Sequence, residues 1–154
     1  MATILQAHGP DAIATARELF KEYQDDLGID LCFQDFSREL ATLPGAYAPP
    51  RGRLLLADVD GVVAGCVALR PVNDQAGEMK RLYVRPAFRG SGTGRALVES
   101  VITEARAIGY HHICLDTLPV MARAQELYER LGFKDIPSYR ANPVQGARFL
   151  ALDL

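Results

Sequence analysis

Three glycines within five residues, Gly90, Gly92 and Gly94, form the part of the sequence with the clearest chemical meaning. Glycine lets successive backbone N–H groups crowd together and point inward, and such a concave set of donors binds anions. An apolar stretch suited to a strand precedes the loop. An amphipathic stretch follows it, and the positive end of that helix would strengthen the site. We therefore expect a pyrophosphate-binding loop here.

The charges around this loop favour the same kind of ligand. Between Met79 and Arg95 the sequence holds five basic residues and no acidic one, namely Lys80, Arg81, Arg85, Arg89 and Arg95. The whole chain has 17 basic and 19 acidic residues and a net charge of −2, so the excess is local. A local excess of this kind favours a polyanionic ligand. The net charge also argues against a general nucleic-acid-binding surface.

Two common nucleotide-binding motifs do not fit the loop. A P-loop requires Lys followed by Ser or Thr after its last glycine, and here Arg95 and Ala96 stand there. The dinucleotide motif GxGxxG requires a third glycine where the sequence has Leu97. A glycine-rich turn that only joins a strand to a helix is the alternative without a ligand.

The loop and two neighbouring segments resemble one family. The sequence Arg89-Gly90-Ser91-Gly92-Thr93-Gly94 resembles the R/Q-x-x-G-x-G/A acetyl-CoA loop of the GNAT family of N-acetyltransferases. Residues 79–86 are similar to its central strand and strand exit, and residues 124–133 resemble its A-x-x-L-Y-x-x-x-G-F segment. One departure is Met121, where the family often has Asn. A side-chain hydrogen bond to the pantetheine arm would be lost or replaced there.

The resemblance implies the acyl-CoA N-acyltransferase fold of the GNAT family, in which helices flank a central mixed sheet. It also implies a co-substrate and a binding site for it. The co-substrate would be acetyl-CoA, whose pantetheine amides would bond the backbones of Leu82 and Val84 on the central strand. A backbone N–H near Leu82 would stabilise the oxyanion. The residues expected to bind acetyl-CoA are Leu82, Tyr83, Val84, Arg89, Gly90, Ser91, Gly92, Thr93, Gly94, Arg95 and Ala124.

Acetyl transfer to an amine sets three chemical requirements. The amine must lose a proton, because a lysine-like amine has a pKa of ~10.4 and an ammonium has no lone pair. The tetrahedral oxyanion needs a hydrogen-bond donor. The departing thiolate, with a pKa of roughly 8.5 by analogy with cysteine, benefits from a proton. Direct attack needs no covalent enzyme intermediate.

Glu78 and Tyr128 are the candidate catalytic residues. Glu78 stands at the start of the central strand, where the family commonly has Glu, and would act as the base directly or through water. The alternative is a strand-end carboxylate paired with an arginine. Tyr128 shares a helix face with Ala124, Leu127 and Leu131 and would protonate the thiolate. The alternative is a tyrosine that only packs in the core.

The three cysteines, Cys32, Cys66 and Cys114, have no CxxC spacing and predict reduced thiols in a cytoplasmic protein. Cys114 lies in an apolar run, which favours a buried thiol over an acetyl-accepting nucleophile. No group of His, Cys and Asp has metal-ligand spacing, so we expect no metal. No apolar run is long enough to span a membrane, and the first residues lack a secretory signal pattern.

The acceptor is expected to be a primary amine of a small molecule. Residues 18–39 hold seven acidic and two basic residues, which predicts either a funnel for a cationic amine or two solvated helix faces. Tyr23, Phe33 and Tyr139 are candidates for lining the acceptor pocket. Alternatives are acetylation of a peptide or protein N-terminus or lysine, and a non-catalytic sensor of acyl-CoA.

The elements that must position these residues follow from the hydrophobic pattern. The 154 residues, 49% hydrophobic and 23% charged, predict one globular domain over residues 1–154. Strands are expected at residues 4–7, 53–59, 62–69, 78–84, 111–116, near 133, and at 147–152, and helices at 9–28, 34–43, 96–108 and 117–131. The order is strand, two helices, three strands, helix, strand, helix, two strands. This predicts an α/β fold with a mixed sheet. The last strand would pair within the chain or across a dimer, so we expect a monomer or a homodimer.

Overall fold

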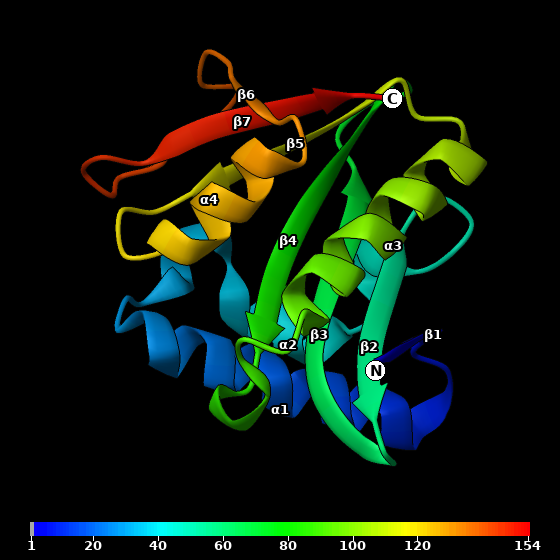
Figure 1. Cartoon of the computed structure of the whole chain (residues 1–154). Helices are drawn as coiled ribbons and strands as arrows, with labels where there is room; N and C mark the ends of the chain where they lie inside the picture. Colours follow the sequence, from blue (N-terminus) through cyan, green and yellow to red (C-terminus); the bar gives the residue numbers. More distant parts are fainter. Residues whose placement is uncertain (1) are drawn as a thin grey trace.

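The computed structural model describes residues 2–154, apart from the side chains of residues 32 and 33. In chain order its strands and α-helices are β1 (Thr3–Gln6), α1 (Gly9–Leu27), α2 (Phe36–Thr42), β2 (Arg53–Val59), β3 (Val62–Pro71), β4 (Ala76–Val84), α3 (Thr93–Ile108), β5 (His112–Thr117), α4 (Ala122–Arg130), β6 (Lys134–Asp135) and β7 (Arg148–Asp153) (Figure 1). Short 3-10 turns are η1 (Leu31–Gln34), η2 (Gly45–Tyr47) and η3 (Pro86–Phe88). This order confirms the predicted α/β fold.

The described strands form a seven-stranded mixed sheet in the order β1-β2-β3-β4-β5-β7-β6. β4 and β5 run parallel, and the other neighbouring strands are antiparallel. The chain crosses from β4 to β5 through α3. The last strand, β7, pairs with β5 of the same chain, with Leu115 opposite Leu150. The predicted tail strand is therefore satisfied within one chain.

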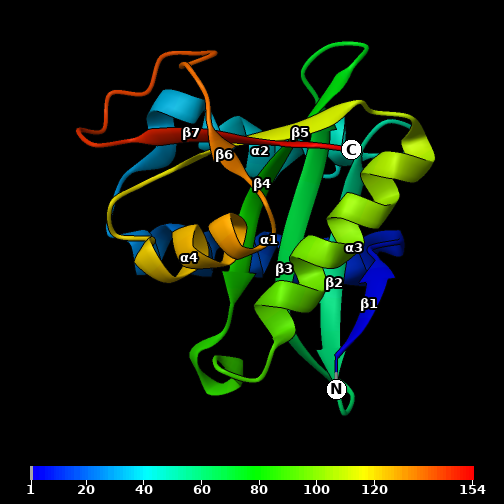
Figure 2. The same cartoon turned by 45° about the horizontal axis from the view of Figure 1, so that its top comes forward.

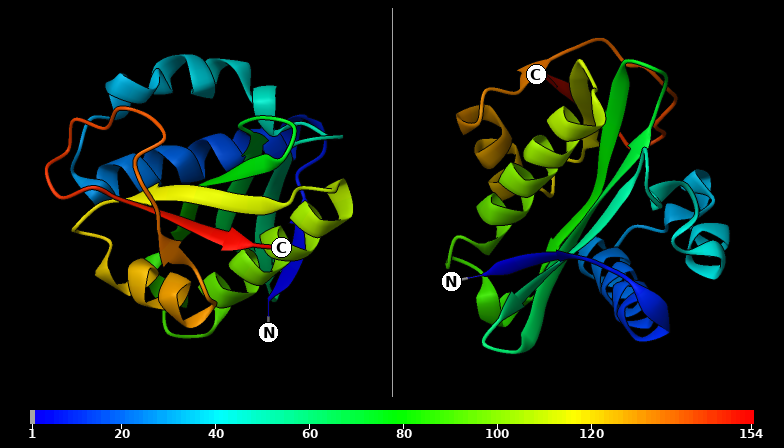
Figure 3. Two further views of the ribbon diagram at one scale, coloured as in Figure 1. Left: turned by 90° about the horizontal axis from the view of Figure 1, so that it is seen from above. Right: turned by 90° about the vertical axis from the view of Figure 1, so that its right-hand side faces the viewer.

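Helices cover both faces of the sheet, with α3 and α4 on one face and α1 and α2 on the other (Figures 2 and 3). The apolar stripe of α3, which includes Leu97 and Val101, packs with Ile113 of β5 into one hydrophobic core. Phe20 of α1 and Leu54 of β2 belong to a second core. Burial of these two stripes fixes the helices on the sheet. Within residues 2–154, none of the helices combines the length and apolar character needed to cross a membrane.

Two predicted helices differ from the structure. The segment 34–43 divides into η1 and α2, because Asp35 between them adopts a left-handed conformation with φ of 56°. The helix expected from residue 117 begins at Ala122 instead. β5 continues to Thr117, and a turn then follows in which the Met121 N–H donates to the Leu118 carbonyl at 2.9 Å.

β4 and β5 separate part of the way along the sheet. They pair only from Ala76 to Glu78 of β4 and from His112 to Cys114 of β5, and then diverge (Figure 1). Beyond the last pair, β4 contains a bulge in which two residues, Arg81 and Leu82, lie opposite one residue of β3. A bulge bends a strand and changes its direction. The result is an opening between two parallel strands in the middle of the sheet.

Candidate active site

A groove of about 480 Å³ lies at the mouth of this opening. Its walls come from the last turns of α1, which include Asp26, and from the end of β4, the loop before α3 and the start of α4. Most residues expected to bind acetyl-CoA line it, namely Leu82, Tyr83, Val84, Arg89, Gly90, Gly92, Gly94, Arg95 and Ala124. Ser91 and Thr93 are not part of this lining. The glycine-rich loop, the central strand and the last helix therefore meet at one site.

The glycine-rich loop has the backbone shape that its sequence predicts. Gly90 and Gly92 have φ values of 80° and 86°, a left-handed conformation that a side chain would strain. Gly92 precedes the first residue of α3, so the unpaired N–H groups of that helix end open toward the loop. The hydroxyls of Ser91 and Thr93 contact each other at 2.9 Å, and Ser91 also donates to the Phe88 carbonyl at 2.5 Å. These two side chains hold the turn in shape.

Only two of the five predicted basic residues line the groove. They are Arg89, whose Nε donates to the Val84 carbonyl at 2.8 Å, and Arg95. A third cation on the groove, Arg123 at the start of α4, was not predicted. No local sequence motif indicated Arg123, because the start of α4 comes close to the glycine-rich loop only when the sheet has folded. Arg85 instead pairs with Glu22 at 2.9 Å.

The backbone of β4 offers hydrogen-bonding groups on its open side. The Tyr83 carbonyl oxygen lies so close to Gly65 of β3 that a Cβ there would collide with it. The N–H and C=O of a strand residue point to the same side, so Leu82 and Val84 present theirs away from β3. Arg89 reaches the Val84 carbonyl from that side. This orientation matches the one expected for strand-like pairing with pantetheine amides.

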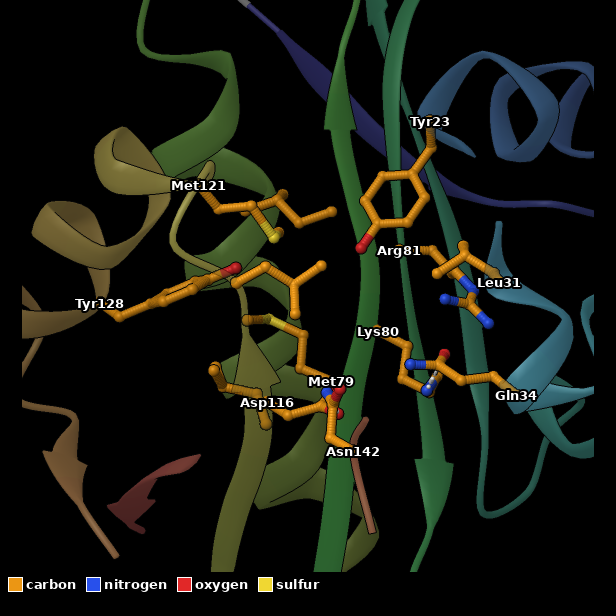
Figure 4. A pocket seen from close by; sticks show the side chains of 13 residues that line it. Tyr23, Leu31, Gln34, Met79, Lys80, Arg81, Asp116, Met121, Tyr128 and Asn142 are labelled. Carbon is orange, nitrogen blue, oxygen red and sulfur yellow. Dashed lines mark hydrogen bonds between the residues drawn. The ribbon is translucent and has the colours of Figure 1, made fainter. Parts of the chain in front are cut away.

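A second cavity, of about 30 Å³, lies deeper between the diverging strands (Figure 4). It is lined by Tyr23, Leu31, Gln34, Met79, Lys80, Arg81, Leu82, Leu115, Asp116, Leu118, Met121, Tyr128 and Asn142. Three of these residues, Tyr23, Leu82 and Met121, also line the groove. The groove and the cavity therefore adjoin beside the bulge of β4.

Tyr128 enters the cavity from α4 (Figure 4). The residue is 3% exposed, and its ring packs on Phe133 with centroids 5.6 Å apart. Its hydroxyl has no hydrogen-bond partner among residues 2–154 and is not sealed off within the protein. Burial raises the pKa of Tyr128, so the hydroxyl stays protonated at neutral pH. The structure thus combines core packing with a free proton donor facing the cavity.

Glu78 lies beside the cavity and is not part of its lining. The residue is 1% exposed, and its carboxylate accepts from Arg70 Nε at 2.9 Å and from the Tyr139 hydroxyl at 2.5 Å. Arg140 Nη2 lies 2.8 Å from the same carboxylate. The arginine pairing considered for this residue is therefore present. Any proton that it takes from an acceptor must pass through an intervening group such as water.

The segment between β6 and β7 supplies site residues that the sequence did not reveal. Its Arg140 donates to Asp116 at 2.9 Å, and its Asn142 donates to the other carboxylate oxygen at 3.0 Å. Tyr139 binds Glu78, as described above, and does not line the cavity. No local pattern links these residues to the site, because β7 inserts beside β5 and carries the segment across from a distant part of the chain.

Arginines pair with part of the predicted acidic funnel. Glu22 pairs with Arg85 and Asp26 with Arg89, as close as 2.9 and 3.3 Å. A further carboxylate of the seven, Glu39, pairs with Arg81.

The structure also gives positions for the other residues singled out in the sequence. Tyr23 lines both cavities, and the side chain of Phe33 lies outside the described residues. Met121 precedes α4, and its sulfur accepts from the Thr117 hydroxyl at 3.8 Å. Burial raises the pKa of Cys114 to about 11, which fits an unreactive buried thiol. Among residues 2–154, no group of three His, Cys, Asp or Glu side chains is placed to hold a metal ion.

Comparisons with known proteins agree with this geometry. Residues 13–133 match the model of the acetyltransferase (GNAT) family. An uncharacterised N-acetyltransferase of Schizosaccharomyces pombe is 38% identical over 147 residues, which cover 94% of this chain and 90% of the yeast protein. An acetyltransferase structure from Streptococcus agalactiae superposes with a TM-score of 0.80 at 24% identity, over 99% of this chain and 98% of the other.

A GNAT acetyltransferase structure from Elizabethkingia anophelis, with acetyl-CoA bound, has a TM-score of 0.66 at 21% identity. The match covers 99% of this chain and 98% of that one. The groove brings together the glycine-rich loop, the N-terminal end of α3 and the part of β4 that holds Leu82 and Val84. The chain belongs to the GNAT family of acetyltransferases, enzymes that use acetyl-CoA as the acetyl donor.

Proposed function

We propose that residues 1–154 form one domain that transfers an acetyl group from acetyl-CoA to a primary amine of a small molecule by direct attack. The observation that carries this proposal is that the two cavities share Tyr23, Leu82 and Met121 in their linings. The groove with the glycine-rich loop therefore adjoins a buried space that is faced by a tyrosine hydroxyl without a partner among the described residues. This arrangement suits a reaction in which a long anionic donor delivers its reactive end to a shielded site.

The groove residues would hold the donor in a defined orientation. The N–H groups at the start of α3, together with Arg89, Arg95 and Arg123, supply positive potential for the pyrophosphate. The open backbone groups of Leu82 and Val84 would bond the pantetheine amides. Acetyl-CoA supplies an activated thioester, and the Leu82 N–H beside the bulge would stabilise the developing oxyanion.

Glu78 is proposed as the base that receives the acceptor proton. Its buried position behind the cavity wall supports a route through water, since the residue does not line the cavity. Its contacts with Arg70, Arg140 and Tyr139 hold the carboxylate in one orientation. A fixed orientation suits a proton relay, because each hydrogen bond must be aligned for transfer.

Tyr128 is proposed as the donor to the departing thiolate. Its hydroxyl is protonated and unpartnered among the described residues, so it can bond a sulfur atom placed in the cavity. Its raised pKa lies above that of a thiol. An acceptor that enters as an ammonium releases two protons, one to Glu78 through water before attack and one from the tetrahedral intermediate. The second proton would replace the one that Tyr128 gives to the thiolate, so that the tyrosine ends protonated.

One observation weighs against a non-catalytic sensor. A sensor that only binds acyl-CoA has no need for a free proton donor at the end of the groove, and Tyr128 is present. A peptide or protein acceptor remains the second candidate within the same chemistry. We also propose a cytoplasmic location, which the free thiols of Cys66 and Cys114 support.

A thermal-shift series combined with thiol-release assays tests the proposal. Acetyl-CoA at about 100 times its Kd should add ~2.7 kcal/mol to the folded state, whereas ATP and NAD should leave Tm unchanged. Amines added to the acetyl-CoA complex should release free CoA thiol. A shift with ATP or NAD equal to that with acetyl-CoA would contradict the donor assignment. Thiol release with peptides and not with small amines would favour the second candidate.

A further inference from the structure

We propose that Lys80 and Gln34 form a subsite for the carboxylate of the acceptor, and that the acceptor is an amino acid. The inference rests on the proposed function, since it assigns the substrate class of the same site. Lys80 is an ionisable group in the deeper cavity that the proposed transfer mechanism does not use.

Lys80 is a buried cation that points into a cavity. It stands on β4 just before the bulge, is 6% exposed and forms part of the cavity lining. Its Nζ donates to Gln34 Oε1 at 2.9 Å (Figure 4). An ammonium group has three N–H donors, so this contact uses one of them. The remaining donors have no other hydrogen-bond partner among residues 2–154.

Lys80 is also the unpaired charge of the cavity. The other lining cation, Arg81, forms a two-pronged ion pair with Glu39 at 2.8 and 2.9 Å. The lining carboxylate, Asp116, is bound by Arg140 at 2.9 Å. Within the described part of the chain, no carboxylate lies in ion-pair contact with Lys80. When Lys80 is protonated, the cavity therefore has a positive charge with no ion-pair partner among the described residues.

Gln34 adds a second donor at the same place. Lysine has no acceptor atom, so the amide oxygen of Gln34 must face Nζ and the amide nitrogen remains a donor. A carboxylate accepts hydrogen bonds on both of its oxygens and gains most from a charged donor in a buried site. An acceptor ammonium beside Lys80 would instead be repelled. The chemistry at this wall suits an anionic group of the acceptor.

The protonation of Lys80 supports this assignment. Burial lowers its pKa to about 7, and the neighbouring Arg81 and Arg140 act in the same direction. The charges of Glu78 and Asp116 raise the pKa of Lys80, but their combined effect is smaller than that of burial and the two arginines. An acceptor carboxylate would add a closer negative charge and raise the pKa of Lys80. Binding of the acceptor and protonation of Lys80 are thereby coupled.

The two walls of the cavity indicate the kind of molecule. Lys80 stands on the β4 wall and Tyr128 enters from α4 on the opposite side of the same cavity (Figure 4). An acceptor whose anionic group binds Lys80 and whose amine reacts beside Tyr128 must carry both a carboxylate and an amine. An amino acid meets this requirement, with its carboxylate held and its amine directed to the donor.

The test compares matched acceptors on the whole enzyme. Each amino acid is assayed beside its primary amide and its decarboxylated amine, with thiol release from acetyl-CoA as the readout. The same set is measured for Lys80→Met, Lys80→Arg and Lys134→Met, the last being a control at an exposed lysine of β6. Acetyl-CoA binding is measured by calorimetry for every variant, so that loss of fold or donor binding is recognised.

We expect the wild-type enzyme to prefer an amino acid over its amide by 10-fold or more in kcat/KM. Lys80→Met should raise KM for the amino acid at least 10-fold and abolish that preference, whereas Lys80→Arg should retain most of it. The wild-type preference for the amino acid over its amide should also fade above about pH 7, because Lys80 loses its proton there. The preference should persist at this pH in Lys80→Arg.

Other outcomes would overturn the inference. Equal use of amides, or an equal loss of kcat for all amines in Lys80→Met, would assign Lys80 to another role such as the base. Acetylation of Lys80 itself, seen by mass spectrometry without an acceptor, would make it a nucleophile. Failure of every amine in all three classes, with no thermal shift from acetyl-CoA, would instead reject the proposed function.

Discussion

Arg81 and Glu39 form a two-pronged ion pair between the bulge of β4 and helix α2. Arg81 Nε lies 2.8 Å from one carboxylate oxygen, and Nη2 lies 2.9 Å from the other. Arg81 holds a left-handed φ of 60°, which is costly for a residue with a side chain. The pair anchors this backbone where β4 departs from β5. It thereby helps to keep open the space in which both cavities lie.

Loss of this pair should destabilise the protein. The Arg81 side chain is 2% exposed, so Glu39→Ala would leave a buried cation without its partner. We expect a loss of about 3 kcal/mol in the free energy of unfolding, measured with urea. Glu99→Ala is the matched control. It removes an exposed partner of Arg95 and should change stability by about 0.5 kcal/mol or less. Equal losses in the two variants would show that the buried pair does not stabilise the bulge.

Lys80 should make stability depend on pH. Its pKa is about 7 in the folded protein and 10.5 for the free side chain, so the unfolded chain binds more protons between these values. Stability should therefore rise with pH across this window, and the penalty for holding a charged Lys80 is complete below pH 7. Lys80→Met should be more stable than the wild type at pH 6, by an amount on the order of 4 kcal/mol.

That difference should shrink toward pH 10. Urea unfolding at several pH values would measure it, with Lys134→Met as the control at an exposed position. Parallel curves for the wild type and Lys80→Met would show that Lys80 has an ordinary pKa in the folded protein.

Arg123 should contribute to donor binding although no motif identified it. Its place at the start of α4, on the groove, predicts that Arg123→Gln weakens acetyl-CoA binding about 3- to 10-fold at low salt. The effect should decrease as salt screens the charge. Calorimetry would measure both affinities. Arg130→Gln, on the same helix and outside the groove lining, should bind acetyl-CoA like the wild type, and equal weakening in both variants would indicate a general charge effect.

Glu78→Gln should lower kcat/KM about 100-fold if Glu78 receives the acceptor proton. Acetyl-CoA affinity should change little, since Glu78 lies away from the groove. Tyr139→Phe removes one hydrogen bond to the carboxylate and keeps the base, so it should retain most activity. Both variants would be checked for fold by urea unfolding. Unchanged kcat/KM of Glu78→Gln at every pH would eliminate the proposed role.

The order of elements and the donor site could be predicted because their signals are local. The apolar stripe of α3 lies within a short window of the sequence. The left-handed turn of the glycine-rich loop could be expected in the same way, because glycine at positions 90 and 92 permits its positive φ values. These signals require no knowledge of distant contacts.

The acceptor side could not be predicted because its residues meet only in the folded sheet. Arg140 and Asn142 reach Asp116 because β7 inserts beside β5. Arg81 has a side chain at a left-handed position, where sequence alone would suggest glycine or asparagine. The status of Lys80 as the unpaired charge depends on the pairing of every other charge around it. Such a property exists only in three dimensions.

The most direct test of the account is thiol release from acetyl-CoA by the wild-type enzyme and Tyr128→Phe, with an amine that the wild type accepts. The substitution keeps the ring in the core and removes only the hydroxyl that faces the cavity. We expect kcat to fall at least 100-fold, with acetyl-CoA affinity and Tm close to those of the wild type. Full activity of Tyr128→Phe would contradict the account and leave Tyr128 as a residue of the core.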